Sequence, residues 1–269
     1  MSDDRYSRQS FLGANSEEII KSSTIGIVGL GGGGSHIAQQ LAHIGFINFV
    51  IYDGDNIEKT NLNRLIGSKL EDIKNSTPKI DIATRSIYGL QPDAKIKLFR
   101  SRWQDNPHPL RNCDIVFGCI DGFAERRELE SCARRYMIPY IDIGVDVNTI
   151  DGEPPVMSGQ VILSLPGGPC LTCLNFLNES NLAKEAALYG DAGTHPQVVW
   201  ANGVLASTAV GIGVDLITGW TGSESCFIYL SYYSNENTMK PHPRTEYISN
   251  CECTHYPANN VGDPIFRNI

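Results

Sequence analysis

Two acidic side chains follow predicted strands in the N-terminal half of the chain. Asp53 ends the apolar strand predicted over 49–52, and Asp121 ends the strand predicted over 114–119. Ligands of open parallel sheets bind beyond the carboxyl ends of the strands. We therefore expect Asp53 to accept hydrogen bonds from ribose hydroxyls and Asp121 to bind Mg²⁺. Asp121 could also cap the helix predicted over 124–136, and the two roles are compatible.

A polar loop with two asparagines and an arginine lies between these acids. Asn61, Asn63 and Arg64 fall within the segment 54–64. Asparagines commonly serve turns, which is the alternative to a role in ligand binding. A fixed arginine that follows them suits the recognition of phosphate oxygens, because its planar guanidinium presents several donors.

Lys79 is placed where a cation is unfavourable without a nearby anion. Thr77 suits the N-cap and Pro78 the first position of a helix, so Lys79 falls in the first turn, at the positive end of the helix dipole. A phosphate would supply the anion, and a solvated surface lysine is the alternative. An arginine, a lysine and a further carboxylate suit a triphosphate with Mg²⁺ better than the single pyrophosphate of a dinucleotide. The sequence therefore favours ATP over NAD.

A glycine-rich turn is predicted to bring the phosphates to these side chains. The short apolar strand 25–28 precedes the turn, and the segment 35–44 has the periodicity of a helix. Backbone amides at a helix N-terminus bind anions, and glycine allows the close approach. On this pattern alone a nicotinamide or flavin dehydrogenase would be the default interpretation. The glycines expected to bind the nucleotide are Gly29, Gly31, Gly32 and Gly34.

The alternation of strands and helices predicts an α/β fold with a doubly wound, mainly parallel sheet. Further strands are predicted over 96–99, 140–144 and 159–165. A chain of 269 residues is long enough for one generous core and too short for two large domains. We expect a single domain that covers residues 1–269.

Charge and hydropathy exclude several classes of partner. A net charge of −8 disfavours nucleic acids, because binding to their backbone requires clustered lysine and arginine. The polar, acidic segment 1–10 lacks the pattern of a secretory signal, so we expect a cytoplasmic protein. The apolar segment 198–220 is interrupted by Asn202 and Asp215, which favours a buried helix near the sheet over a membrane span.

Six short motifs occur in the order that is typical of one family. They are R-Y-S-R-Q at 5–9, G-L-G-G-G-G at 29–34, D-G-D at 53–55, N-L-N-R at 61–64, T-P-K at 77–79 and C-I-D at 119–121. The chain thus resembles the ThiF/MoeB/HesA family, the bacterial relatives of ubiquitin-activating enzymes. The resemblance implies a Rossmann-like sheet that additional C-terminal strands extend to form a surface for the tail of an acyl substrate.

The implied activity is the ATP- and Mg²⁺-dependent adenylation of the C-terminal carboxylate of a small ubiquitin-like or sulfur-carrier protein. In this family the arginine at the position of Arg64 contacts the ATP phosphates. The arginine at the position of Arg8 reaches the phosphates of the partner subunit, which implies a homodimer. A peptide-modifying adenylyltransferase is an alternative that the sequence does not separate from this function, and an NAD-binding oxidoreductase is a more distant one.

Family members that transfer the acyl group to their own cysteine carry it in the crossover loop. The corresponding segment here, 182–197, contains no cysteine. We therefore expect the chain to adenylate its substrate without a catalytic cysteine of its own. A downstream conjugating enzyme or a sulfur donor would then receive or supply the transferred group.

Two close pairs of cysteines predict a structural zinc site. Cys170 and Cys173 form a C-x-x-C pair, and Cys251 and Cys253 form a C-x-C pair. Two such pairs can surround Zn²⁺ tetrahedrally and tie the C-terminal tail, about 234–269, to the body of the protein. His255 is a candidate replacement for one thiolate. Redox-active or inert cysteines are the alternatives.

The other cysteines are expected to be free and inert. A cytoplasmic location argues against a disulfide framework despite the even number of cysteines. Each lies in or beside a predicted core element, and buried free cysteine is common. These residues are Cys113, Cys119, Cys132 and Cys226.

Overall fold

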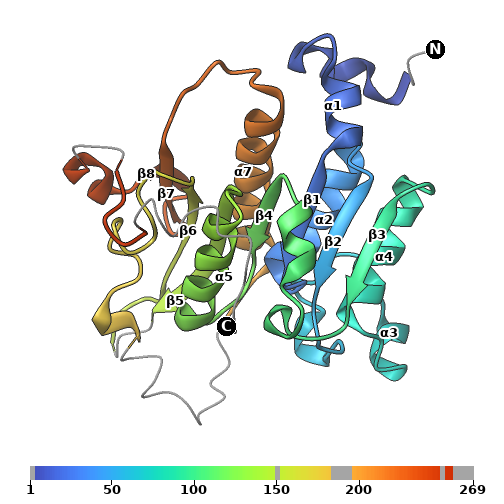
Figure 1. Cartoon of the computed structure of the whole chain (residues 1–269). Coiled ribbons are helices and arrows are strands. Elements are labelled where there is room, and N and C mark those ends of the chain that lie inside the picture. The colour runs from blue at the N-terminus through green and yellow to red at the C-terminus, as the bar shows by residue number, and fades with distance from the viewer. Residues whose placement is uncertain (1–3, 149–151, 183–195, 249–251, 257–269) are drawn as a thin grey trace.

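The computed structural model describes residues 4–148, 152–182, 196–248 and 252–256. Within these residues the chain forms one eight-stranded sheet in the order β3-β2-β1-β4-β5-β6-β7-β8 (Figure 1). Five neighbouring strands pair in parallel, namely β1 (Thr24–Val28), β2 (Asn48–Tyr52), β3 (Lys95–Phe99), β4 (Ile115–Gly118) and β5 (Tyr140–Asn148).

The remaining three strands extend the sheet beyond β5 in antiparallel order. They are β6 (Val156–Ser164), β7 (Phe227–Tyr233) and β8 (Thr238–Pro241). The predicted α/β fold, a mainly parallel sheet with additional C-terminal strands, is confirmed. In Figure 1 the parallel strands β1 to β3 lie on one side of the molecule and β6 to β8 on the other.

The order of the strands reverses at β1, where a ligand cleft is expected. The chain runs outward from β1 through β2 to β3 and then returns to place β4 on the other side of β1. Ile27 of β1 therefore pairs with Ile51 of β2 and with Phe117 of β4. These three apolar residues are completely buried, as the inner strands of a parallel sheet require. The reversal leaves a crevice at the carboxyl ends of β1 and β4.

Helices connect the strands and cover both faces of the sheet. The α-helices are α1 (Ser16–Ser22), α2 (Gly32–Ile44), α3 (Leu70–Lys74), α4 (Lys79–Leu90), α5 (Phe123–Arg135) and α7 (Val199–Thr218). Short 3₁₀ helices complete the described elements, namely η1 (Asp4–Leu12), η2 (Lys59–Asn61), η3 (Trp103–Asp105), η4 (His108–Asn112) and η5 (Pro243–Tyr247).

The core forms two main hydrophobic clusters, one on each face of the sheet. Alternate residues of a strand point to opposite faces, so Ile27 and Val28 of β1 belong to different clusters. Ile27 packs in the cluster that includes Ile37 of α2 and Ala209 of α7. Val28 packs in the cluster that includes Leu129 of α5. The sheet is thus fixed from both sides, which holds the ends of its strands in place.

The long helix α7 is part of the first cluster. By length and composition alone, this helix could cross a membrane. Its residues Leu205 and Val210 are buried in the core with α2 and the sheet. The packing is close at Gly213, where a Cβ atom would lie 2.8 Å from the ring of Phe117. The predicted helix buried near the sheet is therefore confirmed.

Candidate functional site

A cavity of about 340 Å³ opens at the carboxyl ends of the parallel strands. Its lining comes mainly from β1, β2 and β5, from the segments that follow β1 to β4, and from α7, which agrees with the crevice expected where the strand order reverses. Eight of the residues predicted to bind nucleotide or metal lie in this lining, namely Gly29, Gly31, Gly32, Asp53, Asn61, Arg64, Lys79 and Asp121.

The glycine turn joins β1 to α2 at the centre of the cavity. Gly29 has a φ of +87°, and a Cβ atom there would lie 2.4 Å from the carbonyl oxygen of Cys119. Gly34 lies beneath the turn, where a Cβ atom would lie 1.9 Å from the carbonyl oxygen of Gly29. Gly34 thus permits close packing of helix and strand rather than contact with a ligand.

Helix α2 begins at Gly32 and not at Ser35 as the sequence predicted. The low helix propensity of Gly32, Gly33 and Gly34 is outweighed by tertiary packing, since these residues are buried against the sheet and α7. The first amide groups of a helix have no intrahelical partner. The glycines therefore bring such amides directly to the cavity, in the arrangement that binds phosphate.

Asp53 holds the glycine turn against the following loop. Its Oδ2 accepts a hydrogen bond from the amide of Leu30 at 2.6 Å, and its Oδ1 accepts one from the amide of Asp55 at 2.8 Å. Burial raises the pKa of the Asp53 carboxyl above its usual value, although both backbone hydrogen bonds oppose the shift. The carboxylate lies in the cavity wall after β2, where a ribose would approach it.

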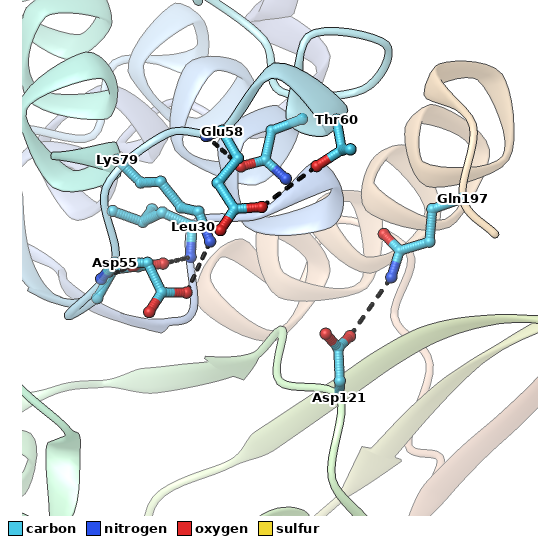
Figure 2. Close-up of polar contacts among 9 residues, drawn as sticks. Leu30, Asp55, Glu58, Thr60, Lys79, Asp121 and Gln197 are labelled. Carbon is cyan, nitrogen blue, oxygen red and sulfur yellow. Dashed lines mark hydrogen bonds and ion pairs between the residues drawn. The ribbon is translucent and has the colours of Figure 1, made fainter. Parts of the chain in front are cut away.

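Lys79 forms an ion pair at the N-terminus of α4. Its Nζ lies 2.7 Å from Oδ2 of Asp55, and only 13% of the lysine side chain is exposed (Figure 2). The helix begins at Lys79 with Pro78 at the N-cap, so the prediction of Thr77 as N-cap is wrong. The backbone at 56 and 78 forms a β-bridge that fixes this arrangement. Asp55 supplies the anion expected beside Lys79, and a bound phosphate would compete with it.

The loop after β2 uses its asparagines in two ways. Asn61 lines the cavity, and its Oδ1 accepts a hydrogen bond from the amide of Glu58 at 2.9 Å, which caps η2. Asn63 is outside the cavity lining, and its Nδ2 donates to the carbonyl oxygen of Gln197 at 2.9 Å. Nη1 of Arg64 donates to the carbonyl oxygen of Thr60 at 2.7 Å, which holds the guanidinium at the cavity wall.

Asp121 follows β4 on the other side of the glycine turn. Its side chain is exposed to the cavity, and its Oδ1 accepts a hydrogen bond from Nε2 of Gln197 at 3.4 Å (Figure 2). The N-cap of α5 is Gly122, so the alternative role of Asp121 as a helix cap is not realised. A carboxylate that is exposed and held by one long hydrogen bond is available to a metal ion.

Arg8 lies in η1, away from the cavity of its own chain. Its side chain is exposed, and it is not among the residues that line the cavity. The described residues therefore do not bring Arg8 together with Arg64, Lys79 and Asp121.

The cavity includes residues that the sequence did not single out. Trp103 is 1% exposed, lines the cavity, and has an indole Nε1 without a partner among the described residues. Asn202 is 5% exposed and lies so close to Gly32 that a Cβ there would be 2.6 Å from its Nδ2. Ser101 and Arg102 line the same side as Trp103. The position of 101–103 shortly after the strand predicted over 96–99 could have indicated that they line the cavity.

A second cluster of chemically reactive residues lies at the turn after β6. The distances from Sγ of Cys173 are 3.6 Å to Sγ of Cys170, 3.7 Å to Sγ of Cys253 and 3.2 Å to Nδ1 of His255. We call these four residues the cysteine–histidine cluster, and all of their ligand atoms lie within 4.8 Å of one another. The predicted ligand Cys251 lies outside the described residues.

The donor set and the spacing of the cluster fit zinc. Zinc–sulfur bonds of about 2.3 Å give sulfur–sulfur separations of roughly 3.8 Å in a tetrahedron. The two sulfur–sulfur contacts of 3.6 and 3.7 Å agree with that geometry. Three thiolates with one imidazole form a typical structural zinc site.

Two of the remaining cysteines behave as predicted. Cys113 and Cys132 are free and buried, and burial raises the pKa of each thiol to about 12. Cys119 is free but only half-buried, and it lines the cavity. Cys226 takes part in a disulfide, so its prediction as a free thiol is wrong. Sequence spacing did not indicate this bond, since disulfide pairing depends on tertiary contact.

Comparison with known proteins identifies relatives that match part of this chain. A model of the ThiF family matches residues 5–253. The SAMP-activating enzyme E1 of Haloferax volcanii is 31% identical over 176 residues, which cover 64% of this chain and 61% of that protein. Ubiquitin-like modifier-activating enzyme 5 of Dictyostelium discoideum is 25% identical over 247 residues, which cover 85% and 62%. The chain thus spans less than two thirds of the length of these curated relatives.

The fold is similar to that of MccB in two solved structures. E. coli MccB with ATP has a TM-score of 0.70 and 21% identity, over 90% of this chain and 71% of that chain. The microcin C7 biosynthetic enzyme MccB in complex with N-formylated MccA has a TM-score of 0.72 and 20% identity, over 88% and 71%. At these identities the likeness shows the fold alone.

Proposed function

The chain belongs to the ThiF family, and on that premise we propose that it is an ATP- and Mg²⁺-dependent adenylyltransferase. Its substrate in this proposal is the C-terminal carboxylate of a small ubiquitin-like or sulfur-carrier protein. The observation that carries the proposal is that Arg64, Lys79 and Asp121 face the same cavity as the glycine turn and Asp53. The relatives named as activating enzymes support the substrate class.

Each side chain has a role that follows from its position. Asp53 would bind the ribose, since it lies at the end of β2 beside the turn. The amides of the glycine turn, together with Arg64 and Lys79, would bind the phosphates. Asp121 would hold Mg²⁺, and Mg²⁺ would neutralise charge on the phosphate oxygens. Lys79 would exchange Asp55 for phosphate, which is possible because 72% of the Asp55 side chain is exposed.

The reaction needs no nucleophile from the protein. A carboxylate oxygen of the substrate attacks the α-phosphorus of ATP, and the bond from that phosphorus to the oxygen of the β-phosphate breaks. The products are an acyl-adenylate and pyrophosphate, which takes the bonding electrons. The protein contributes position and charge neutralisation, because two anionic reactants must meet.

Exposed apolar side chains at both ends of α7 support a homodimer. Phe11 of η1 is 65% exposed and Trp220, just after α7, is 48% exposed. Their rings stack edge to face with centroids 5.3 Å apart. Trp200 and Val204 of α7 are also exposed. A second subunit that covers these side chains would bury them and bring Arg8 near the phosphates of its partner.

The remaining parts of the proposal concern the tail and the acyl transfer. The cysteine–histidine cluster would bind Zn²⁺ and tie the tail, about 234–269, to one adenylation domain. The segment 182–197 has no cysteine, so the acyl group would pass directly to a conjugating enzyme or a sulfur donor in the cytoplasm. Most of that segment, residues 183–195, lies outside the described residues.

A peptide-modifying adenylyltransferase is the second candidate. The candidate comes from the likeness in fold to MccB, which was solved in complex with N-formylated MccA. Such an enzyme would use the same nucleotide cavity for the carboxylate of a short peptide.

Pyrophosphate exchange tests the proposal and separates the two candidates. The protein is incubated with Mg²⁺, ATP and labelled pyrophosphate, together with either a panel of β-grasp proteins that end in Gly-Gly or a panel of short peptides. We expect a β-grasp protein to stimulate the exchange of label into ATP. Stimulation by peptides alone would select the second candidate. ATP turnover without either would contradict both.

A further inference from the structure

Gln197 connects Asp121, which follows β4, to the loop that follows β2. Its Nε2 donates to Oδ1 of Asp121 at 3.4 Å, and its carbonyl oxygen accepts from Nδ2 of Asn63 at 2.9 Å. The backbone just beyond it is fixed as well, because Nδ2 of Asn202 donates to the carbonyl oxygen of Val198 at 3.0 Å. The side chain is therefore presented to the cavity from an anchored backbone.

The order of the strands shows which end of the cavity remains for the acyl group. Asp53 follows β2, the glycine turn follows β1, and Asp121 follows β4. In Figure 2 Lys79 and Asp55 lie on one side, while Asp121 and Gln197 lie on the other. If Lys79 holds the leaving pyrophosphate, the nucleophile must approach the α-phosphorus from the opposite side, because attack and departure are roughly in line.

That end of the cavity is unfavourable for an incoming carboxylate without a donor. Two carboxylates, those of Asp121 and Glu125, line it. Beyond them the wall consists of Ile143, Gly144 and Val145 of β5, which offer no side-chain donor. Within the described residues, Gln197 and Asn202 are the uncharged amides here, and Asn202 is only 5% exposed and donates one of its two Nδ2 hydrogens to the backbone.

We propose that Gln197 contacts the reacting group of the acyl substrate, an inference that rests on the proposed function. Its Nε2 donates to a carboxylate oxygen of the substrate and then to the carbonyl oxygen of the acyl-adenylate. The bond to Asp121 is long and weak, so the donor transfers to the substrate at little cost. Binding of Mg²⁺ by Asp121 would release the same amide.

Binding of two small molecules tests this contact without knowledge of the carrier. The probes are AMP and glycylglycyl-sulfamoyladenosine, a stable analogue of an acyl-adenylate. Their dissociation constants are measured by calorimetry on the wild type, Gln197→Ala and Gln197→Glu. Gln40→Ala on α2, outside the cavity lining, is the matched control.

We expect the wild type to bind the analogue more tightly than AMP. Gln197→Ala should raise the dissociation constant of the analogue about tenfold, which is the scale of one hydrogen bond, and leave that of AMP unchanged. Gln197→Glu should weaken the analogue at least as much, since it replaces a donor by an anion.

Three outcomes contradict the inference, and they point to different errors. An analogue-to-AMP ratio unchanged in Gln197→Ala overturns the contact and leaves the proposed function intact. An equal loss of both ligands shows that Gln197 supports the nucleotide site as a whole, which also overturns the contact. A wild type without any preference for the analogue overturns the proposed function, and the inference with it.

Discussion

The nucleotide cavity draws its polar groups from the ends of adjacent strands, whereas the cysteine–histidine cluster joins positions about 80 residues apart in the chain. Two charged groups of the cavity have partners within the protein: Asp53 accepts from two amides, and Lys79 pairs with Asp55. The cluster instead brings three cysteine sulfurs and an imidazole nitrogen within 4.8 Å of one another. The ion pair of Lys79 in the cavity can thus be exchanged for a ligand, while the four ligand atoms of the cluster are compatible with one zinc ion.

Helix α5 connects the two regions. It starts two residues after Asp121, and its residues Glu130 and Arg134 hold the turn that carries Cys170. Oε1 of Glu130 accepts from the amide of Leu171 at 2.9 Å, and Arg134 donates to the carbonyl oxygen of Leu165 at 2.7 Å. Changes in the cavity should therefore affect activity, and changes at the cluster or beneath it should affect stability.

The largest effect is expected from Asp121→Ala. Loss of this carboxylate removes the proposed metal anchor and leaves phosphate charge uncompensated, so carrier-dependent pyrophosphate exchange should fall by at least ~10³-fold. The melting temperature should stay near that of the wild type, because the side chain is exposed. Asp93→Ala, also at an exposed position, is the control. Exchange within a few-fold of the wild type would remove Asp121 from the site.

A mixing experiment tests whether Arg8 belongs to the cavity of a partner. Arg8→Ala and Lys79→Ala should each be nearly inactive, because each lacks one cation for the phosphates. In an equal mixture, half of the dimers are mixed and each has one intact site, so activity should recover to about a quarter of the wild type. Absence of recovery after proven exchange of subunits would place Arg8 outside catalysis or in its own subunit's site.

Metal removal should affect stability more than nucleotide binding. Cys170→Ser, or extraction of zinc by a chelator, should lower the melting temperature by roughly 5 to 15 °C, since a structural metal contributes directly to folding. The affinity for ATP should change little, because the cluster is not part of the cavity lining. Cys113→Ser provides a comparison at a buried free thiol. A preparation without stoichiometric zinc that melts normally would contradict the metal assignment.

The smallest effect is expected beneath the cluster, at Glu130. Burial raises the pKa of Glu130 to about 7, whereas the unfolded chain titrates near the ordinary value of about 4.3. Between these values the folded state binds the proton that the unfolded state has lost. The stability contributed by protonated Glu130 is therefore present at low pH and is lost as the pH rises through about 7.

Glu130→Gln should remove this dependence. The variant should gain roughly 1 to 3 kcal/mol relative to the wild type between pH 5 and pH 8, as measured by urea unfolding. Glu18→Gln on the exposed side of α1 should show no such gain. A parallel pH dependence in the wild type and Glu130→Gln would mean that another group titrates.

The strands of the parallel half of the sheet were predictable because each is marked by a short, continuous stretch of the sequence. Apolar runs buried on both faces mark the inner strands, and a carboxylate at the end of such a run falls at the ligand edge of the sheet, as Asp53 and Asp121 do. The start of α2 was misplaced because close packing, which no periodicity shows, allows Gly32 to Gly34 to be helical.

The contacts that depend on distant parts of the chain were not predictable in the same way. Gln197 meets Asp121 across 76 positions, and Asn63 turned out to hold Gln197 where a ligand contact was expected. Spacing did indicate that Cys170 and Cys173 would meet the tail, and His255 was a candidate from its position after Cys253. The disulfide of Cys226 had no such signal.

The most direct measurement is the intact mass of every species after the protein is incubated with ATP, Mg²⁺ and an accepted carrier under non-reducing conditions. We expect a carrier that has gained an adenylyl group at its C-terminus, while the mass of the enzyme stays unchanged. An enzyme that has gained the mass of the carrier and loses it with dithiothreitol would reveal a thioester and contradict the account. Turnover of ATP without any adenylated carrier would contradict it equally.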